Sequence, residues 1–108
     1  MDDSFSDREK GYEAKFKLDA DRLFKVEAKR NKLLGFWLAE KYGLNAEKTE
    51  SYAKEVIIAD MDEPGLEGVI RKVMTDIQAR GVNITETEIR QKINELNSLA
   101  MIEVEANE

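Results

Sequence analysis

The chain contains neither cysteine nor histidine among its 108 residues. Without cysteine there is no disulfide framework, no thiolate nucleophile and no cysteine-ligated zinc site. Without histidine the chain lacks the usual general base, the commonest metal ligand and the one side chain that ordinarily titrates near neutral pH. We therefore expect no enzyme activity, and we expect the fold and self-association of the chain to stay constant between about pH 6 and 8.

Long apolar runs are also absent. No uninterrupted apolar stretch approaches the roughly 18 residues that a membrane-spanning helix requires. The first four residues, MDDS, are acidic, whereas a secretory signal begins with basic residues. We expect a protein that is neither exported nor embedded in a membrane, and the reducing cytoplasm is the location that fits a chain without cysteine.

Positive charge is in the minority, with 17 Lys and Arg against 23 Asp and Glu and a net charge of -6. Proteins that bind nucleic acid gain most of their affinity by neutralising phosphates, so this sign disfavours generic nucleic-acid binding. Hydrophobic residues still make up 42% of the chain, which is enough to form the core of one small domain. We expect a single domain that acts by binding another protein.

Proline and glycine are sparse and divide the chain. The only proline is Pro64, followed by Gly65, and further breaks stand at Gly43 and Gly81. Between the breaks, apolar residues recur at helical spacing and nowhere sustain the alternation of a strand. The sequence predicts an all-α fold, a four-helix bundle with short connections.

Three of the four segments have clear helix signatures. Asn45 is predicted to cap the second segment, Gly81 to end the third, and Thr85 with Glu88 to form a capping box at the start of the fourth. The acidic end, residues 103–108, is expected to fray. The predicted core stripes are Tyr52, Ala53, Val56, Ile57 and Met61, then Leu66, Val69, Ile70, Val73 and Ile77, then Ile89, Ile93, Leu96 and Ala100.

The first segment has two unlike halves. Residues 23–42 are rich in apolar side chains and predict a helix central to the core. Residues 6–18 are mostly charged, with a thin apolar line through Tyr12 and Phe16, and Gly11 costs a helix there about 1 kcal/mol relative to alanine. This part is either an amphipathic arm, residues 1–18, that orders against a partner, or a frayed extension of the first helix. Residues 19–108 are expected to form the bundle.

A basic stretch lies near the start of the bundle. Its interpretations are a contact for an acidic protein surface or a nucleotide phosphate, or a solvated helix face paired with acids of other helices. An acidic cluster at Asp60, Asp62 and Glu63 lacks the spacing of a calcium loop, so we expect no metal site there. The basic stretch contains Arg22, Lys25, Lys29, Arg30 and Lys32, with Glu27 as the single acid among them.

Several short stretches carry a resemblance to a known family. They are residues 7–10 (DREK), 13–16 (EAKF), 30–37 (RNKLLGFW), 52–56 (YAKEV) and 71–73 (RKV). The sequence resembles the zeta inhibitor subunit family of the alpha-proteobacterial F-type ATP synthase over nearly its whole length. The run RNKLLG before an aromatic pair is the most specific of these features.

The resemblance implies a four-helix bundle with a mobile N-terminal arm. In that family the arm is inserted at a catalytic interface between the alpha, beta and gamma subunits of F1 and stops ATP hydrolysis, while the bundle docks on the outside of F1. It also implies a location in the bacterial cytoplasm, peripheral to the inner membrane through the ATP synthase, and no required cofactor. The implied inhibitory contacts are Phe5, Arg8, Glu9, Tyr12, Glu13, Lys15 and Phe16.

A second function is compatible with the same fold. A small helical regulatory module would bind adenine nucleotide weakly through the basic stretch between Arg22 and Lys32. Titration of ATP against amide chemical shifts separates the two, because an inhibitor without a nucleotide site gives no localised response.

Overall fold

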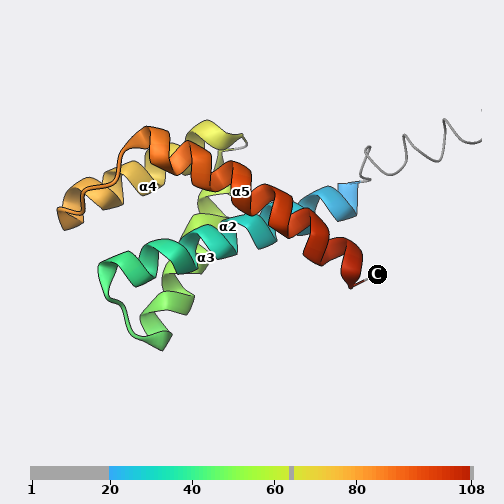
Figure 1. Cartoon of the computed structure of the whole chain (residues 1–108), viewed down its shortest axis with the longest axis horizontal. Helices are drawn as coiled ribbons and strands as arrows, with labels where there is room; N and C mark the ends of the chain where they lie inside the picture. Colours follow the sequence, from blue (N-terminus) through green and yellow to red (C-terminus); the bar gives the residue numbers. More distant parts are fainter. Residues whose placement is uncertain (1–19, 64, 108) are drawn as a thin grey trace, which may run out of the picture.

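The chain folds into helices in the computed structural model, which describes residues 20–63 and 65–107. The helices are α2 (Ala20–Tyr42), α3 (Ala46–Asp62), α4 (Leu66–Arg80) and α5 (Glu86–Ala106) (Figure 1). These described residues contain no strand, and the predicted all-α fold with four helices is confirmed. The predicted division into residues 1–18 and 19–108 falls on a boundary outside the described residues and stays a prediction.

The helix ends follow the predicted capping chemistry. The Asn45 side chain accepts a hydrogen bond from the Lys48 backbone N–H at 2.8 Å, at the start of α3. At the start of α5, Thr85 Oγ1 accepts from the Glu88 backbone N–H at 3.1 Å and the Thr85 N–H donates to Glu88 Oε1 at 3.0 Å. Gly81 ends α4 with a φ of 67°, a left-handed conformation that glycine adopts without strain. All three predicted caps are confirmed.

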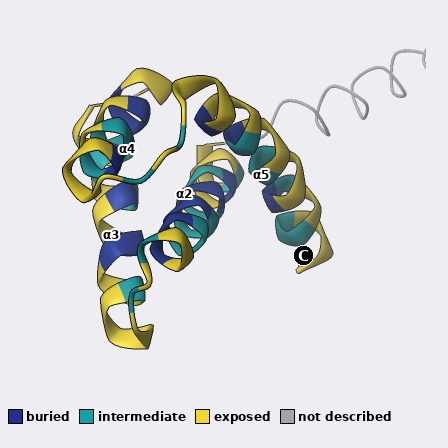
Figure 2. Ribbon diagram, turned by 60° about the vertical axis from the view of Figure 1, so that its left-hand side comes forward, coloured by how far each residue is buried: buried dark blue, intermediate teal, exposed yellow. Residues whose placement is uncertain are grey.

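Helix α2 is the central element. It packs along α3 on one side and along α5 on another, and α4 packs against α3 and α5. Figure 1 shows the start of α2 and the end of α5 at the same end of the molecule. In Figure 2 the buried residues lie on the sides of the helices that face one another, which is the pattern of a helix bundle.

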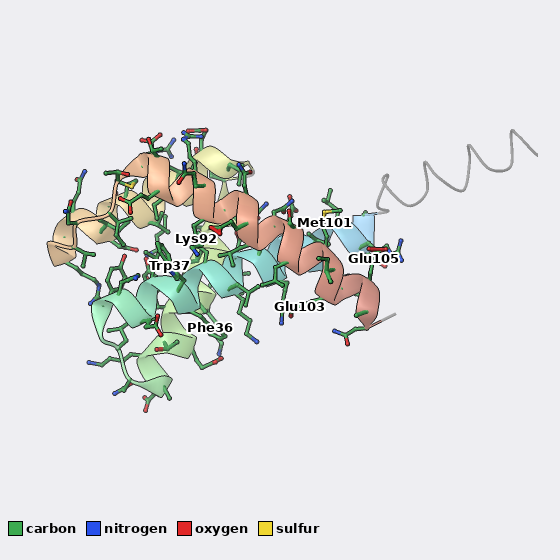
Figure 3. All side chains as sticks on the ribbon, viewed as in Figure 1. Phe36, Trp37, Lys92, Met101, Glu103 and Glu105 are labelled. Atoms are coloured by element: carbon green, nitrogen blue, oxygen red, sulfur yellow. The ribbon has the colours of Figure 1, made fainter. Side chains whose placement is uncertain are left out.

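The core is built from the predicted stripes of all four helices. Ile57 and Leu96, which the stripes also included, are half-buried. Trp37 packs partly buried against the core, and Figure 3 shows it beside Lys92, whose ammonium lies 5.0 Å from the indole ring centroid. The buried core side chains are Leu34, Leu38, Tyr52, Val56, Val69, Ile70, Val73, Ile77, Ile89 and Ile93.

Four apolar positions that were predicted to be buried are exposed. Leu23 and Phe24 lie near the start of α2, Met61 lies at the end of α3, and Leu66 is the first residue of α4. Each stands at a helix end, where neighbouring helices no longer cover both sides. An apolar stripe can continue to the end of a helix, whereas the neighbouring helices that would bury it do not always extend that far.

The acidic C-terminal stretch is helical rather than frayed as far as Ala106. Glu103 forms an ion pair with Lys29 of α2, with 3.1 Å between the Lys29 Nζ and a Glu103 carboxylate oxygen. The Asn107 backbone N–H donates to the Glu103 carbonyl at 3.2 Å. The prediction of fraying was wrong for residues 103–106 because the end of α5 lies along α2.

Helices α2 and α3 approach each other most closely at Gly35. A Cβ atom on this residue would lie 2.6 Å from the Cα of Ala53 and 3.1 Å from its Cβ. Contacts shorter than 3.0 Å do not occur between real carbon atoms of this kind, so the glycine is required by the spacing of the two helices. The role of Gly35 is steric, because the atom that a side chain here would meet first is the Ala53 Cα, which belongs to the backbone of α3.

Gly35→Ala should lower the free energy of unfolding by about 1–3 kcal/mol, measured by urea denaturation. Alanine favours a helix over glycine by about 1 kcal/mol, so a purely local effect would be stabilising. Ser98→Ala, at an exposed position of α5, is the control and should change stability by less than about 0.5 kcal/mol. A Gly35→Ala protein as stable as the unchanged chain would contradict the close approach.

Candidate functional site

The predicted inhibitory contacts lie outside the described residues. They all precede Ala20, and their role stays a prediction. These residues are Phe5, Arg8, Glu9, Tyr12, Glu13, Lys15 and Phe16.

The basic stretch occupies the first half of α2. Lys25 is exposed and Arg22 is half-buried. Lys29 pairs with Glu103 of α5, and the Lys32 ammonium lies 5.5 Å from the centroid of the Phe36 ring. The Lys29 pair agrees with the interpretation of this stretch as a solvated helix face that pairs with acids of other helices. Nucleotide binding by Arg22, Lys25, Lys29, Arg30 and Lys32 stays a prediction.

Arg30 points into the bundle and is only 7% exposed. Its Nη2 lies 3.5 Å from Asp60 Oδ2 of α3, and its Nη1 donates to Asn97 Oδ1 of α5 at 3.5 Å. Its Nε donates to Asn31 Oδ1 at 3.2 Å, and Asn31 Nδ2 donates to Asp60 Oδ2 at 2.9 Å. The guanidinium therefore joins three helices through one buried polar cluster, which we call the Arg30 cluster: Arg30, Asn31, Asp60 and Asn97.

The buried pairing of Arg30 was not predicted, although the sequence carried a signal for it. Arg30 lies four residues after Val26 and four before Leu34, and both of these are buried. A position at that spacing shares their helix face, so a cation there must enter the bundle and find a partner. Its partner, Asp60, was grouped with Asp62 and Glu63 by closeness in sequence.

The acidic cluster is dispersed in space. Asp60 pairs with Arg30, whereas Glu63 pairs with Arg71 of α4 through an ion pair on the surface. Asp62 is exposed. Across residues 20–63 and 65–107, no group of three or more acidic side chains is placed to hold a metal ion.

A second polar cluster lies between α3 and α4. The Tyr52 hydroxyl, on a side chain that is almost fully buried, donates to Asp76 Oδ2 at 2.8 Å. The Lys72 ammonium lies 2.9 Å from the same oxygen and 2.7 Å from Glu55 Oε1. Burial, the hydrogen bond with Tyr42 and the Asp76 carboxylate all raise the pKa of the Tyr52 hydroxyl. This cluster is a packing feature at neutral pH, since the phenol stays protonated.

The charged groups of both clusters are used within the fold. Both hold ions or hydroxyls against partners on neighbouring helices, which is how buried polar groups are satisfied inside a fold.

Among the helices that the structure describes, none is both long and apolar enough to cross a bilayer.

Comparison with known proteins decides the family. The family model described as ATPase inhibitor subunit zeta matches residues 1–103. The chain belongs to the ATPase inhibitor subunit zeta family. The resemblance inferred from the short sequence stretches is therefore confirmed, and the family name gives an inhibitor of an ATPase.

A solved structure supports the fold of this zeta-family chain. It is titled "Solution NMR structure of the protein", is 39% identical, and aligns with a TM-score of 0.69 over 79% of this chain and 96% of that chain. Among curated proteins, no significant match was found.

Asp60→Ala should destabilise the zeta-family bundle by about 3 kcal/mol, because it leaves the Arg30 charge buried without its counter-ion. Asp62→Ala removes a carboxylate two residues away at an exposed position and should change the free energy of unfolding by less than about 0.5 kcal/mol. Both are measured by urea denaturation at neutral pH. Equal effects of the two substitutions would show that the buried ion pair contributes nothing specific.

Tyr52→Phe tests the second cluster at alkaline pH. Because the folded chain holds the pKa of Tyr52 above its ordinary value near 10, the protonated phenol stabilises the fold fully below pH 10, and this contribution is lost as pH rises further. For the unchanged chain, the Tyr52 contribution to the free energy of unfolding should fall by about 1.4 kcal/mol per pH unit above about pH 10. Tyr52→Phe should flatten this slope, and an unchanged slope would contradict the assignment.

Proposed function

We propose that the N-terminal segment, residues 1–18, is the inhibitory element, and that it acts by insertion at an interface of the alpha, beta and gamma subunits of F1. The support comes from family membership together with the position of the core. The matched family pattern begins at residue 1, so it includes this segment. Within the described residues, the buried hydrophobic side chains begin at Val26, so the described core is assembled without the segment.

The proposed mechanism is steric and electrostatic. Aromatic side chains, Phe5, Tyr12 and Phe16, would be buried at the subunit interface, and charged neighbours would pair with F1 side chains. A segment held at a catalytic interface prevents the subunit movements that hydrolysis requires. The helices α2 to α5 would remain on the outside of F1 and tether the segment.

The charge distribution of the helices fits a tether rather than a catalyst. Arg30, Lys29 and Lys72 each pair with an acid of another helix or with a neighbour on the same helix. Such pairs fix the helices relative to one another, which is what a tether requires. The protein would be located where its partner is, at the ATP synthase.

Adenine-nucleotide binding at the basic stretch remains the alternative proposal. Its first requirement is a set of cations that converge on a phosphate. Arg30 is directed into the bundle toward Asp60, so a nucleotide at this surface would depend mainly on Arg22, Lys25 and Lys32. Localised amide shifts of these residues on addition of ATP would support it.

Deletion of residues 1–17 should abolish inhibition and leave the helices folded. F1 hydrolysis with the truncated chain should equal that of F1 alone, whereas the full chain should suppress it. Circular dichroism and the urea midpoint of the truncated chain verify that loss of inhibition is not loss of fold.

The matched control keeps the full length. Tyr12→Ala with Phe16→Ala removes two apolar side chains but not the segment, and it should weaken inhibition at least about tenfold if both rings are buried in the complex. Inhibition by the truncated chain at the level of the full chain would place the inhibitory site on α2 to α5 and overturn the proposal.

A further inference from the structure

Large apolar side chains that are exposed are confined to one half of the described fold. They lie in the first half of α2, the second half of α3, the first residue of α4 and the second half of α5. The half that contains Gly43 and Gly81 has none of them. These side chains are Leu23, Phe24, Ile58, Met61, Leu66, Leu99 and Ile102.

A groove opens between α2 and α3 in that half, with a volume of about 310 Å³. Phe24, which is 54% exposed, and Met61, which is 60% exposed, lie on its two sides. Its lining is mostly apolar, which suits an occupant that brings apolar side chains. The lining residues are Phe24, Glu27, Ala28, Asn31, Ile57, Asp60, Met61 and Gly65.

We propose that this groove is the docking site of the chain's own N-terminal segment, and that it takes the rings of Tyr12 and Phe16. The segment outside the described helices ends at Asp19, directly before α2. From Ala20, the groove begins at Phe24, about 6 Å along the helix axis, and extends to Asn31, about 16 Å along it. Nineteen residues span about 28 Å even when helical, so the segment is long enough to reverse and follow the groove.

The spacing of the two aromatic residues matches the length of the groove. Tyr12 and Phe16 are four residues apart, which places them on one face of a helix about 6 Å from each other. In the proposed docked state, a reversal at residues 17–19 would bring Phe16 level with Phe24 and Tyr12 level with Ala28. Both rings would then reach apolar side chains of the groove.

Charge favours the part of the segment that carries the rings. The groove lining holds the carboxylates of Glu27 and Asp60 and no cation, and Asp60 is already paired with Arg30. Residues 8–17 hold four cations against the acids Glu9 and Glu13, whereas residues 1–7 add three acids. The attraction is therefore local, between Glu27 and the cations close to the rings in sequence.

Covalent attachment favours this occupant over a second copy of the chain. A segment joined by a short connection is present at an effective concentration in the millimolar range, whatever the protein concentration. The segment of a second copy would occupy the groove to the same extent only if the protein concentration itself were in the millimolar range. Weak contacts from two rings therefore suffice within one molecule.

The regulatory consequence rests on the proposed function. Tyr12 and Phe16 are among the residues proposed to bury against F1, so docking in the groove withholds them from F1. Inhibition then requires the segment to leave the groove before it binds F1. The equilibrium between the docked and the released segment sets the fraction of the protein that is competent to inhibit.

A nitroxide label tests the proposal on the isolated full chain. The chain has no cysteine, so Ala14→Cys, between the two rings in sequence, gives a single attachment site. We expect amide signals of residues 57–65 to lose intensity relative to residues 46–50 at the opposite end of α3. Tyr12→Ser with Phe16→Ser keeps the tether but removes the rings, and it should restore the signals of residues 57–65.

Two substitutions on α3 form a matched pair. Met61→Lys places a cation in the groove and should restore the signals, whereas Ile58→Lys, at an exposed position outside the lining, should not. Signal loss that survives both Met61→Lys and removal of the rings would reflect the tether alone and would overturn the proposal.

A mixed sample identifies the occupant. Labelled chain without ¹⁵N is combined with unlabelled ¹⁵N chain, and we expect no signal loss at residues 57–65 in the ¹⁵N protein. Loss in this sample would show that a second copy supplies the segment, which would overturn docking within one molecule. Because F1 is absent from these measurements, their failure leaves the proposed function standing, and the truncation assay tests that function separately.

Discussion

The close contact between Gly35 and Ala53 fixes the distance between α2 and α3, and the rest of the core is built around that distance. With no Cβ on Gly35, the two backbones approach until Ala53 nearly touches α2. Leu34 and Leu38 then meet Tyr52 and Val56 on either side of the contact, and all four side chains are buried. Arg30 lies five residues before Gly35 in α2, where the same spacing brings Asp60 within reach of its guanidinium. A larger separation would leave that cation in the interior without a counter-ion.

Local signals in the sequence were sufficient for the helices and their ends. Asn45, Gly81 and the Thr85 capping box each act through atoms a few residues away, so nothing outside the segment is needed to predict them. Other features depend on which helix lies alongside. They are the exposure of Phe24 and Met61, the helical end of α5 and the pairing of Arg30 with Asp60. Those neighbours are set by packing between distant parts of the chain, which periodicity does not encode. The interior position of Arg30 was the exception, since its spacing from Val26 and Leu34 already indicated the buried face.

Function in this family does not require a concave site of the enzymatic kind. The described helices use their charges on one another, through the Arg30 cluster, the Tyr52 cluster and surface pairs such as Arg90 with Glu67 and Glu86. Under the proposed function, the chain would act by presenting its N-terminal segment to F1, with the paired helices behind it. The family name, ATPase inhibitor subunit zeta, agrees with a regulatory role.

The hydrogen bond from Arg30 to Asn97 joins residues that are 67 positions apart in the chain. Contacts between α2 and α3, and between α3 and α4, close loops of a few residues, whereas α5 returns to α2 only after both intervening helices have been made. Loop-closure entropy and contact order therefore place the docking of α5 last in assembly. Because α5 is synthesised last, Asp60 becomes available to Arg30 before Asn97 does. Until α5 has docked, the side of α2 that it covers stays open to solvent, and the chain is then most exposed to aggregation.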